Sequence, residues 1–295
     1  MGGAPQEGSA ASQKDAGASA GGRRERRIWQ PRWYMWDGGF LALGRSTGTV
    51  PPHAHHAIQI TVALDGTIAM TAGDVHAEGQ GLITAPDVQH LLEMRNAFMA
   101  LLFVDPESHE GRWLGRSLEG PLTRIPPAKL EACTTNLQSI LNDPLDGVET
   151  ARLIHTTVRN LCTGPAPARH PDARVTRALE LIREMDTRKI SLEEVAASVF
   201  LSPSRFAHIF SEVVGLPFRR YVLWRRLTRA IIAVGRGKTL TAAAHSCGFS
   251  DSAHLTRACA QMFGNAPSVV LGPGEFYEIP APFELPTARS QEFRE

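Results

Sequence analysis

Two stretches of this chain, about 48 residues apart, share one pattern that restricts how the chain can fold. Each has a short segment with a small apolar face, then a turn, then a longer amphipathic segment that ends at a glycine. The first stretch runs from Ser191 to Gly215 and the second from Leu240 to Gly264. A short helix that braces a second one across a tight turn is typical of a helix-turn-helix unit. The pattern therefore predicts two such units in tandem.

Capping residues mark where the helices of the first unit begin and end. Ser191, with Glu194 three residues later, has the spacing of a capping box. Ser202 and Pro203 are an N-cap and a first-turn proline, and Gly215 is a helix stop. Helical spacing predicts a buried face of Phe206, Ile209, Phe210 and Val213, and an outward face of Ser204, Arg205, Ala207, His208 and Ser211.

The second unit follows the same rules, and a long helix is predicted to join the two. Ser250 or Asp251 caps its second helix, and Gly264 ends it. Its predicted outward face is Ser252, Ala253, Thr256, Arg257 and Ala260, opposite Leu255, Cys259, Met262 and Phe263. The joining helix, 218–234, is predicted to bury Tyr221, Trp224, Leu227, Ile231 and Val234, with Arg219, Arg220, Arg225, Arg226 and Arg229 around it.

The charge of the chain is distributed unevenly. Residues 173–270 carry 14 Lys and Arg against 7 Asp and Glu, whereas residues 33–172 carry 9 against 15, although the whole chain has a net charge of only +1. A basic segment in a neutral chain favours a polyanion as partner for that segment. The major groove of DNA admits one helix, and two helices on a rigid connector can enter grooves about 34 Å apart. We therefore expect double-stranded DNA as a partner.

Residues from about 172 to 268 resemble the DNA-binding domain of the AraC/XylS family of bacterial transcription regulators. The resemblance rests on the segments 191–196, 201–206, 210–215, 247–251 and 263–264. It implies base-reading positions at Ser204, Ala207, His208, Ser252, Ala253, Thr256 and Arg257, with Arg205 beside them. It also implies RNA polymerase as a partner, a cytoplasmic, nucleoid-associated location and no enzymatic activity. Ala243, Leu255 and Cys259 depart from the larger residues usual in the family, which predicts looser packing in the second unit.

The N-terminal half has the pattern of a small β domain followed by two helices. Short apolar runs at 40–43, 57–64, 67–71, 81–85 and 100–104, punctuated by Gly, Pro and Asp, predict an antiparallel barrel or sandwich. Apolar stripes predict two helices, one with Leu130, Cys133, Leu137 and Leu141 and one with Val148, Ala151, His155, Val158 and Cys162. These helices, within 128–162, either pack on their own barrel or form a homodimer interface.

Four histidine and glutamine positions in this half resemble the two sequence boxes of a cupin barrel. They are His53, His55, Gln59 and His90. In metal-binding cupins the resemblance makes such histidines metal ligands, but here an amide replaces the usual carboxylate. The AraC-type regulators carry a cupin-like sensor domain in this position, usually without a metal. We therefore expect His53, His55 and His90, with Trp33 and Trp36 and also Tyr34, to line an effector pocket without a cofactor, the alternative being a metal site.

The sequence thus predicts an α+β chain of two domains. The predicted segments are a disordered tail (1–27), a cupin-like antiparallel β-barrel (28–127), dimerisation helices (128–162), a linker (163–172), an all-α DNA-binding domain (173–270) and an irregular tail (271–295). The leading hypothesis is a transcription regulator that responds to a small-molecule effector. A metal-dependent cupin enzyme with a helical appendage, and a constitutive DNA-binding protein, are the alternatives. No run of about 18 apolar residues predicts a membrane span.

Overall fold

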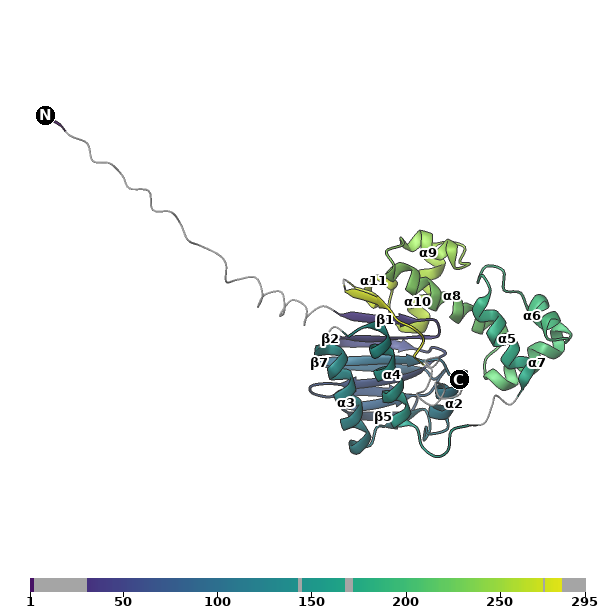
Figure 1. The fold of residues 1–295 in the computed structure, drawn as a ribbon, viewed down its shortest axis with the longest axis horizontal. Coiled ribbons are helices and arrows are strands. Elements are labelled where there is room, and N and C mark those ends of the chain that lie inside the picture. The colour runs from purple at the N-terminus through teal and green to yellow at the C-terminus, as the bar shows by residue number, and fades with distance from the viewer. Residues whose placement is uncertain (3–30, 143–144, 168–171, 273, 283–295) are drawn as a thin grey trace, which may run out of the picture.

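A computed structural model describes residues 1–2, 31–142, 145–167, 172–272 and 274–282 (Figure 1). The predicted tail 1–27, beyond its first two residues, lies outside the described residues, as do 168–171 of the predicted linker and 283–295. The described chain has a β-sheet with helices α3 and α4 on one side and a helical half beyond it. Within the described residues, none of the helices is both long and apolar enough to cross a membrane.

The N-terminal half is built on one nine-stranded sheet that is antiparallel except for one strand pair. Its main path has the order β8-β6-β3-β7-β2-β1-β9, and β4 pairs with β5 and β7. The long strands β2 and β7 pair along most of their length, so they form the spine of the sheet. The strands are β1 (Arg32–Trp36), β2 (Gly39–His53), β3 (Ile58–Ala63), β4 (Ile68–Ala72), β5 (Val75–Gly79), β6 (Gly81–Thr84), β7 (His90–Val104), β8 (Leu122–Arg124) and β9 (Glu275–Glu278).

Three details of this half differ from the prediction. The strand pairings of the described residues leave the sheet open, with β8 and β9 at the ends of its path, rather than closed as a barrel. Part of the tail expected to be irregular forms β9, which pairs in parallel with β1, because the edge of β1 leaves its backbone groups open to a partner. Sequence patterns also missed β1, β5 and β8, which are short.

Helices cover one face of the sheet. Helix α2 (His109–Gly115) precedes β8, and α3 (Pro127–Asn142) and α4 (Gly147–Leu161) pack together against the sheet. Cys133, Leu137 and Ala151 are buried there as predicted, but Val148 is exposed. The buried face of α4 is instead centred on Ile154 and Leu161, which lie on the same side of the helix as Ala151 and Val158. The inner faces of both helices therefore pack on their own sheet.

The helical half begins with three helices that enclose a core of their own. They are α5 (Ala173–Glu184), α6 (Leu192–Ser198) and α7 (Pro203–Val214), and the first turn of α8 (Phe218–Gly235) completes that core with Phe218, Tyr221 and Val222. The rest of α8 packs with α9 (Leu240–Ser246), α10 (Ser252–Phe263) and α11 (Pro267–Val270). Helix α8 therefore belongs to both cores and connects them rigidly.

The second core is shared between the two halves of the chain. Trp33, Phe40 and Phe103 of the sheet pack with Trp224 of α8 and Phe263 of α10. The rings of Phe40 and Phe263 lie 5.7 Å apart, and those of Phe103 and Phe263 lie 5.8 Å apart. The sheet therefore has α3 and α4 on one face and the second helix-turn-helix unit on the other. Among the described residues, the core of this second unit is continuous with the face of the sheet.

Candidate DNA interface and effector cavity

The first recognition helix, α7, has the caps and the exposed face that the sequence predicts. Ser202 accepts a hydrogen bond from the backbone N–H of Arg205, and Gly215 ends the helix in the left-handed conformation with φ of 79°. Phe206, Ile209 and Phe210 are buried. Of the predicted outward residues, Ser204, Arg205 and His208 are exposed, and Ala207 and Ser211 are half-buried.

The second recognition helix, α10, matches the prediction in the same way. Asp251 is its N-cap and accepts from the backbone N–H of His254, and Gly264 ends it with φ of 73°. Ala253, Arg257 and Ala260 are exposed, while Ser252 and Thr256 are half-buried. Leu255, Cys259, Met262 and Phe263 are buried. Both predicted base-reading faces are therefore open to solvent in the described chain.

The arginines of α8 are used differently from the prediction. Arg225, expected on the surface, is buried, and its guanidinium donates to Asp37 in the β1–β2 turn at 2.5 Å. Arg226 donates to the backbone carbonyl of Thr187, and Arg229 to that of Met185. The side chains of these three residues thus hold the helix in place. Arg219 and Arg220 remain exposed, so the basic surface is smaller than the sequence suggests.

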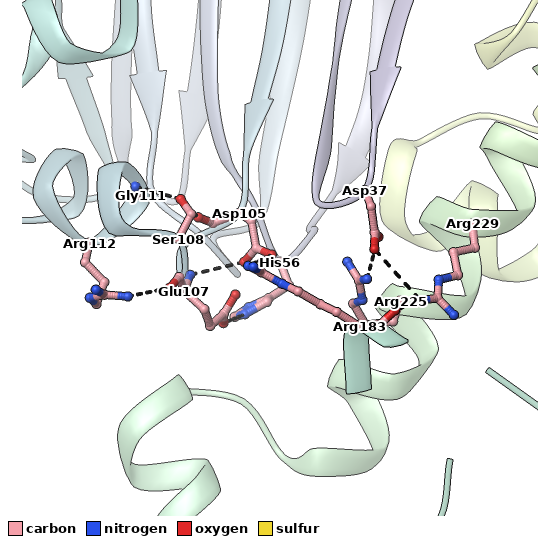
Figure 2. A network of polar contacts seen from close by, with 10 residues as sticks. All are labelled: Asp37, His56, Asp105, Glu107, Ser108, Gly111, Arg112, Arg183, Arg225 and Arg229. Atoms are coloured by element: carbon pink, nitrogen blue, oxygen red, sulfur yellow. Dashed lines mark hydrogen bonds and ion pairs between the residues drawn. The ribbon is translucent and has the colours of Figure 1, made fainter. Parts of the chain in front are cut away.

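A polar network joins the sheet to α5 and α8 (Figure 2). Arg183 of α5 lies 3.7 Å from the buried Asp105 at the end of β7, and Arg225 and Arg229 both face Asp37. Asp105 Oδ2, Tyr221 OH and Arg225 Nη1 are buried without a hydrogen bond among the described residues. Buried charges with incomplete hydrogen bonding contribute little net stability. Sequence reasoning missed this network because its members come from unconnected elements.

Beside Asp105, His56 contacts two carboxylates. Its ring nitrogens lie 2.5 Å from Glu107 and 2.6 Å from Asp87. Burial alone lowers the pKa of His56, but the charge and hydrogen bonds of Glu107 and Asp87 outweigh it and raise the pKa to about 10. Burial and the nearby Asp105 raise the pKa of Glu107 to about 8. The pair therefore keeps its protons to a higher pH than the same groups do in water.

A cavity of about 240 Å³ lies between the sheet and the end of α10. Its wall is mostly apolar and includes Trp33, Phe40 and Phe103 from the sheet and Phe263 from α10. Asn265, Val269 and Val270 close it from the helical half, and Arg45, His53 and Gln59 supply polar groups. Both halves of the chain thus build the same cavity, which a small, mostly apolar molecule fits.

The predicted pocket residues separate into three groups. Trp33 and His53 line the cavity. His55 and His90 are buried beside His53, with its ring centroid 5.6 Å from that of His55 and 4.3 Å from that of His90. Trp36 and Tyr34 lie in the core beneath α3 and α4, so their predicted place in the pocket is wrong. Side chains alternate along a strand, so β1 cannot point Trp33 and Trp36 to the same face.

Comparisons with known proteins match these features. The family model described as "Helix-turn-helix domain" matches residues 195–272. The probable transcriptional regulator LumQ of Photobacterium leiognathi is 33% identical over 82 residues, which are 28% of this chain. That match spans 33% of LumQ, so this chain covers about a third of the length of this curated relative.

Solved structures share the whole two-domain arrangement. ToxT from Vibrio cholerae superimposes with a TM-score of 0.54 at 12% identity, covering 79% of this chain and 98% of ToxT. An apo structure of a ToxT variant from the same organism gives a TM-score of 0.55 at 10% identity, covering 81% of this chain and 98% of that one. At such identity the likeness concerns the fold alone. The C-terminal half thus carries an AraC-type helix-turn-helix domain, and the described chain has the two-domain fold of ToxT.

Proposed function

We propose that this protein is a sequence-specific DNA-binding transcription regulator whose DNA binding responds to a small molecule in the cavity beneath α10. The observation that carries the proposal is that sheet and recognition helix share one cavity wall, through Phe103 and Phe263. A ligand there contacts the sensor half and the end of a DNA-reading helix together. It shifts the protein between states if it binds them with unequal affinity.

The chemistry of the wall indicates the class of effector. The lining is aromatic and aliphatic, with Arg45, His53 and Asn265 among its polar side chains. One ToxT structure contains an unsaturated fatty acid, and another contains a naphthalenyl butenoic acid. We therefore propose an apolar monocarboxylate, small enough for about 240 Å³.

The domain docking supports a response of this kind. The charged contacts between the halves include Asp37 with Arg225 and Arg229, Asp105 with Arg183, and Glu278 of β9 with Arg236. Arg225 Nη1 and Asp105 Oδ2 are buried without a hydrogen bond among the described residues. Such contacts contribute little net stability, so the helical half is held mainly by the apolar shared core. A ligand in the cavity changes that core directly.

Selection from a pool of random duplexes, followed by gel shift at several salt concentrations, tests the DNA-binding function. We expect enrichment of one sequence and an affinity that falls steeply with salt, because arginines neutralise phosphates. A protein that enriches no sequence contradicts the proposal. Repeating the gel shift in the presence of short- and medium-chain carboxylates tests the effector. The variant Phe40→Trp places a larger side chain in the cavity wall, so we expect a carboxylate to lose its effect on the DNA affinity of this variant.

We further propose a homodimer through the exposed sides of α3 and α4, contact with RNA polymerase, and a cytoplasmic, nucleoid-associated location. Val148, exposed on α4, is the natural probe of the dimer. Sedimentation of wild type and Val148→Asp distinguishes dimer from monomer. We propose that the protein acts by binding rather than by catalysis, since family and fold are those of regulators.

A further inference from the structure

Three buried imidazoles meet at one point, two from the end of β2 and one from the start of β7. His53 ends β2, His55 follows it, and His90 begins β7. One ring nitrogen of each lies within 4.8 Å of the others. Around a tetrahedral zinc ion, with Zn–N distances near 2.0–2.1 Å, ligand nitrogens are about 3.4 Å apart. Binding of an ion would draw the three nitrogens, which lie within 4.8 Å of one another, to that spacing.

The hydrogen bonds behind the rings fix which nitrogens face inward. His53 Nδ1 donates to the carbonyl of Pro51 at 2.9 Å, and His90 Nδ1 donates to that of Val88 at 2.9 Å. A carbonyl can only accept, so each neutral ring carries its proton on Nδ1 and presents a bare Nε2. A second ring nitrogen held by a backbone carbonyl is the usual support of a metal-binding histidine.

Gln59 brings an oxygen to the same point. Its amide nitrogen donates to Thr61 Oγ1 at 2.9 Å, which turns Oε1 toward His55 Nε2 at 2.9 Å and His90 Nε2 at 3.3 Å. His55 can donate to this oxygen, but the bare Nε2 of His90 cannot. Two acceptors therefore face each other in a buried place, an arrangement that a bound cation makes favourable.

We propose that His53, His55 and His90 bind one divalent transition-metal ion of the zinc class, with Gln59 Oε1 as a neighbouring oxygen donor. Neutral imidazoles suit zinc, copper, iron and nickel, and the absence of a carboxylate disfavours magnesium and calcium. His53 and Gln59 also line the cavity, so the ion lies at its wall.

The position of the site links it to the second recognition helix. The ring of His55 lies 6.2 Å from that of Trp224 and 6.1 Å from that of Phe263. A Cβ placed on Gly264, the stop residue of α10, would lie 2.9 Å from the Pro51 carbonyl and 3.1 Å from His53 Nδ1. The hydrogen bond from His53 Nδ1 to the Pro51 carbonyl thus lies directly against the end of α10. A metal ion held by His53 is therefore linked to the contact between the sheet and α10.

Zinc titration of the untagged full chain, by calorimetry and by competition with a chromophoric chelator, tests the site. We expect one ion per chain and a rise in melting temperature with zinc, because ligand binding to the folded state stabilises it. Co²⁺ is expected to give visible bands without the thiolate-to-metal absorption of a cysteine site. Removing the hydrogen-bonding partner of a metal ligand typically lowers metal affinity 10- to 100-fold. Removing the ligand itself costs more, so His53→Ala and His90→Ala are each expected to weaken zinc binding by about 100-fold or more.

Matched variants make the result decisive. His76→Ala and His245→Ala, at exposed histidines of β5 and α9, are expected to bind zinc like wild type. Gln59→Glu supplies a carboxylate without removing an imidazole, so it is expected to bind zinc about 10-fold more tightly than wild type. This measurement remains informative even if the alanine variants do not fold. Absence of a stoichiometric site in wild type, equal loss in the control variants, or weaker binding in Gln59→Glu overturns the proposal. DNA binding is not part of the readout, so the outcome is independent of the proposed function.

Discussion

The guanidinium of Arg225 donates to the carboxylate of Asp37, a residue 188 positions earlier in the chain, at 2.5 Å. Arg225 is 1% exposed whereas Asp37 is 47% exposed, so the contact fixes a buried cation of α8 to the rim of the sheet. The pair connects the half that we propose to sense an effector with the helix that joins the two DNA-reading units.

Removing the carboxylate tests that connection. Asp37→Ala leaves Arg225 buried without its nearest anionic partner, and we expect the free energy of unfolding to fall by about 2–3 kcal/mol. Urea unfolding measures the loss. Asp74→Ala, in the exposed β4–β5 turn, is the control and should change stability by less than about 0.5 kcal/mol. Equal effects of the two substitutions would show that the Arg225 contact does not hold the halves together.

Two glycines that end recognition helices provide a matched measurement of the contact between the sheet and α10. Gly215 and Gly264 both have φ above 70°, so alanine strains either by about 1 kcal/mol. Nothing lies within 4 Å of a Cβ at Gly215, whereas a Cβ at Gly264 would lie 2.7 Å from Val50 and 2.9 Å from the Pro51 carbonyl. We expect Gly264→Ala to lower the melting temperature clearly more than Gly215→Ala. A smaller or equal shift contradicts the close packing of α10 on the sheet.

Arg257 is the residue on α10 best suited to contact DNA. Replacing it with alanine is expected to weaken binding to a selected duplex by about 10- to 100-fold, the cost of a lost bidentate base contact. Binding assays against single-base variants of the site distinguish two roles, because a base contact relaxes preference at one position whereas a phosphate contact lowers the salt slope by about one. Arg95→Ala, on the exposed part of β7, is the control. Unchanged affinity in Arg257→Ala would remove α10 from the interface.

The protons held by His56 and Glu107 give stability a defined pH dependence. Both pKa values are raised in the folded chain, to about 10 and about 8, so the folded state binds protons more tightly than the unfolded state. The stability contribution of Glu107 is present below about pH 4.5 and is lost as pH rises to 8, and that of His56 is lost between about 6.5 and 10. Unfolding free energy is therefore expected to fall from pH 7 to pH 9.

Glu107→Gln tests this assignment, because it removes one titrating group and part of the charge that raises the pKa of His56. Urea unfolding at pH 7, 8 and 9 should give a flatter profile for the variant than for wild type. Glu119→Gln, at an exposed site, should keep the wild-type slope. A variant profile as steep as that of wild type would place the pH dependence elsewhere.

The sequence predicted those features that depend on local rules. Caps at Ser202 and Asp251, the stops at Gly215 and Gly264, and the exposed faces of α7 and α10 all follow from hydrogen bonding and periodicity within a dozen residues. Features that depend on the meeting of distant segments could not be predicted in this way. Arg225 has the spacing of a surface residue, and only the approach of the β1–β2 turn explains its burial.

The same distinction explains the errors in the pocket and the tail. Trp33 and Trp36 are equally aromatic, but the register of β1 with β2 and β9 decides which face each takes. The segment 275–278 has little apolar pattern of its own, and it becomes a strand because β1 offers an edge. The three histidines could be grouped from sequence only through the cupin resemblance, since their convergence requires the pairing of His53 with His90 across β2 and β7.

Hydroxyl-radical footprinting of a selected duplex tests the central claim most directly, namely that both exposed recognition helices enter DNA together. The account predicts two protected tracts about one helical turn, 10–10.5 base pairs, apart for each bound chain. The tract read by α10 should disappear in Arg257→Ala while the other remains. A single protected tract that is unchanged by that substitution, or protection without sequence preference, would contradict the claim.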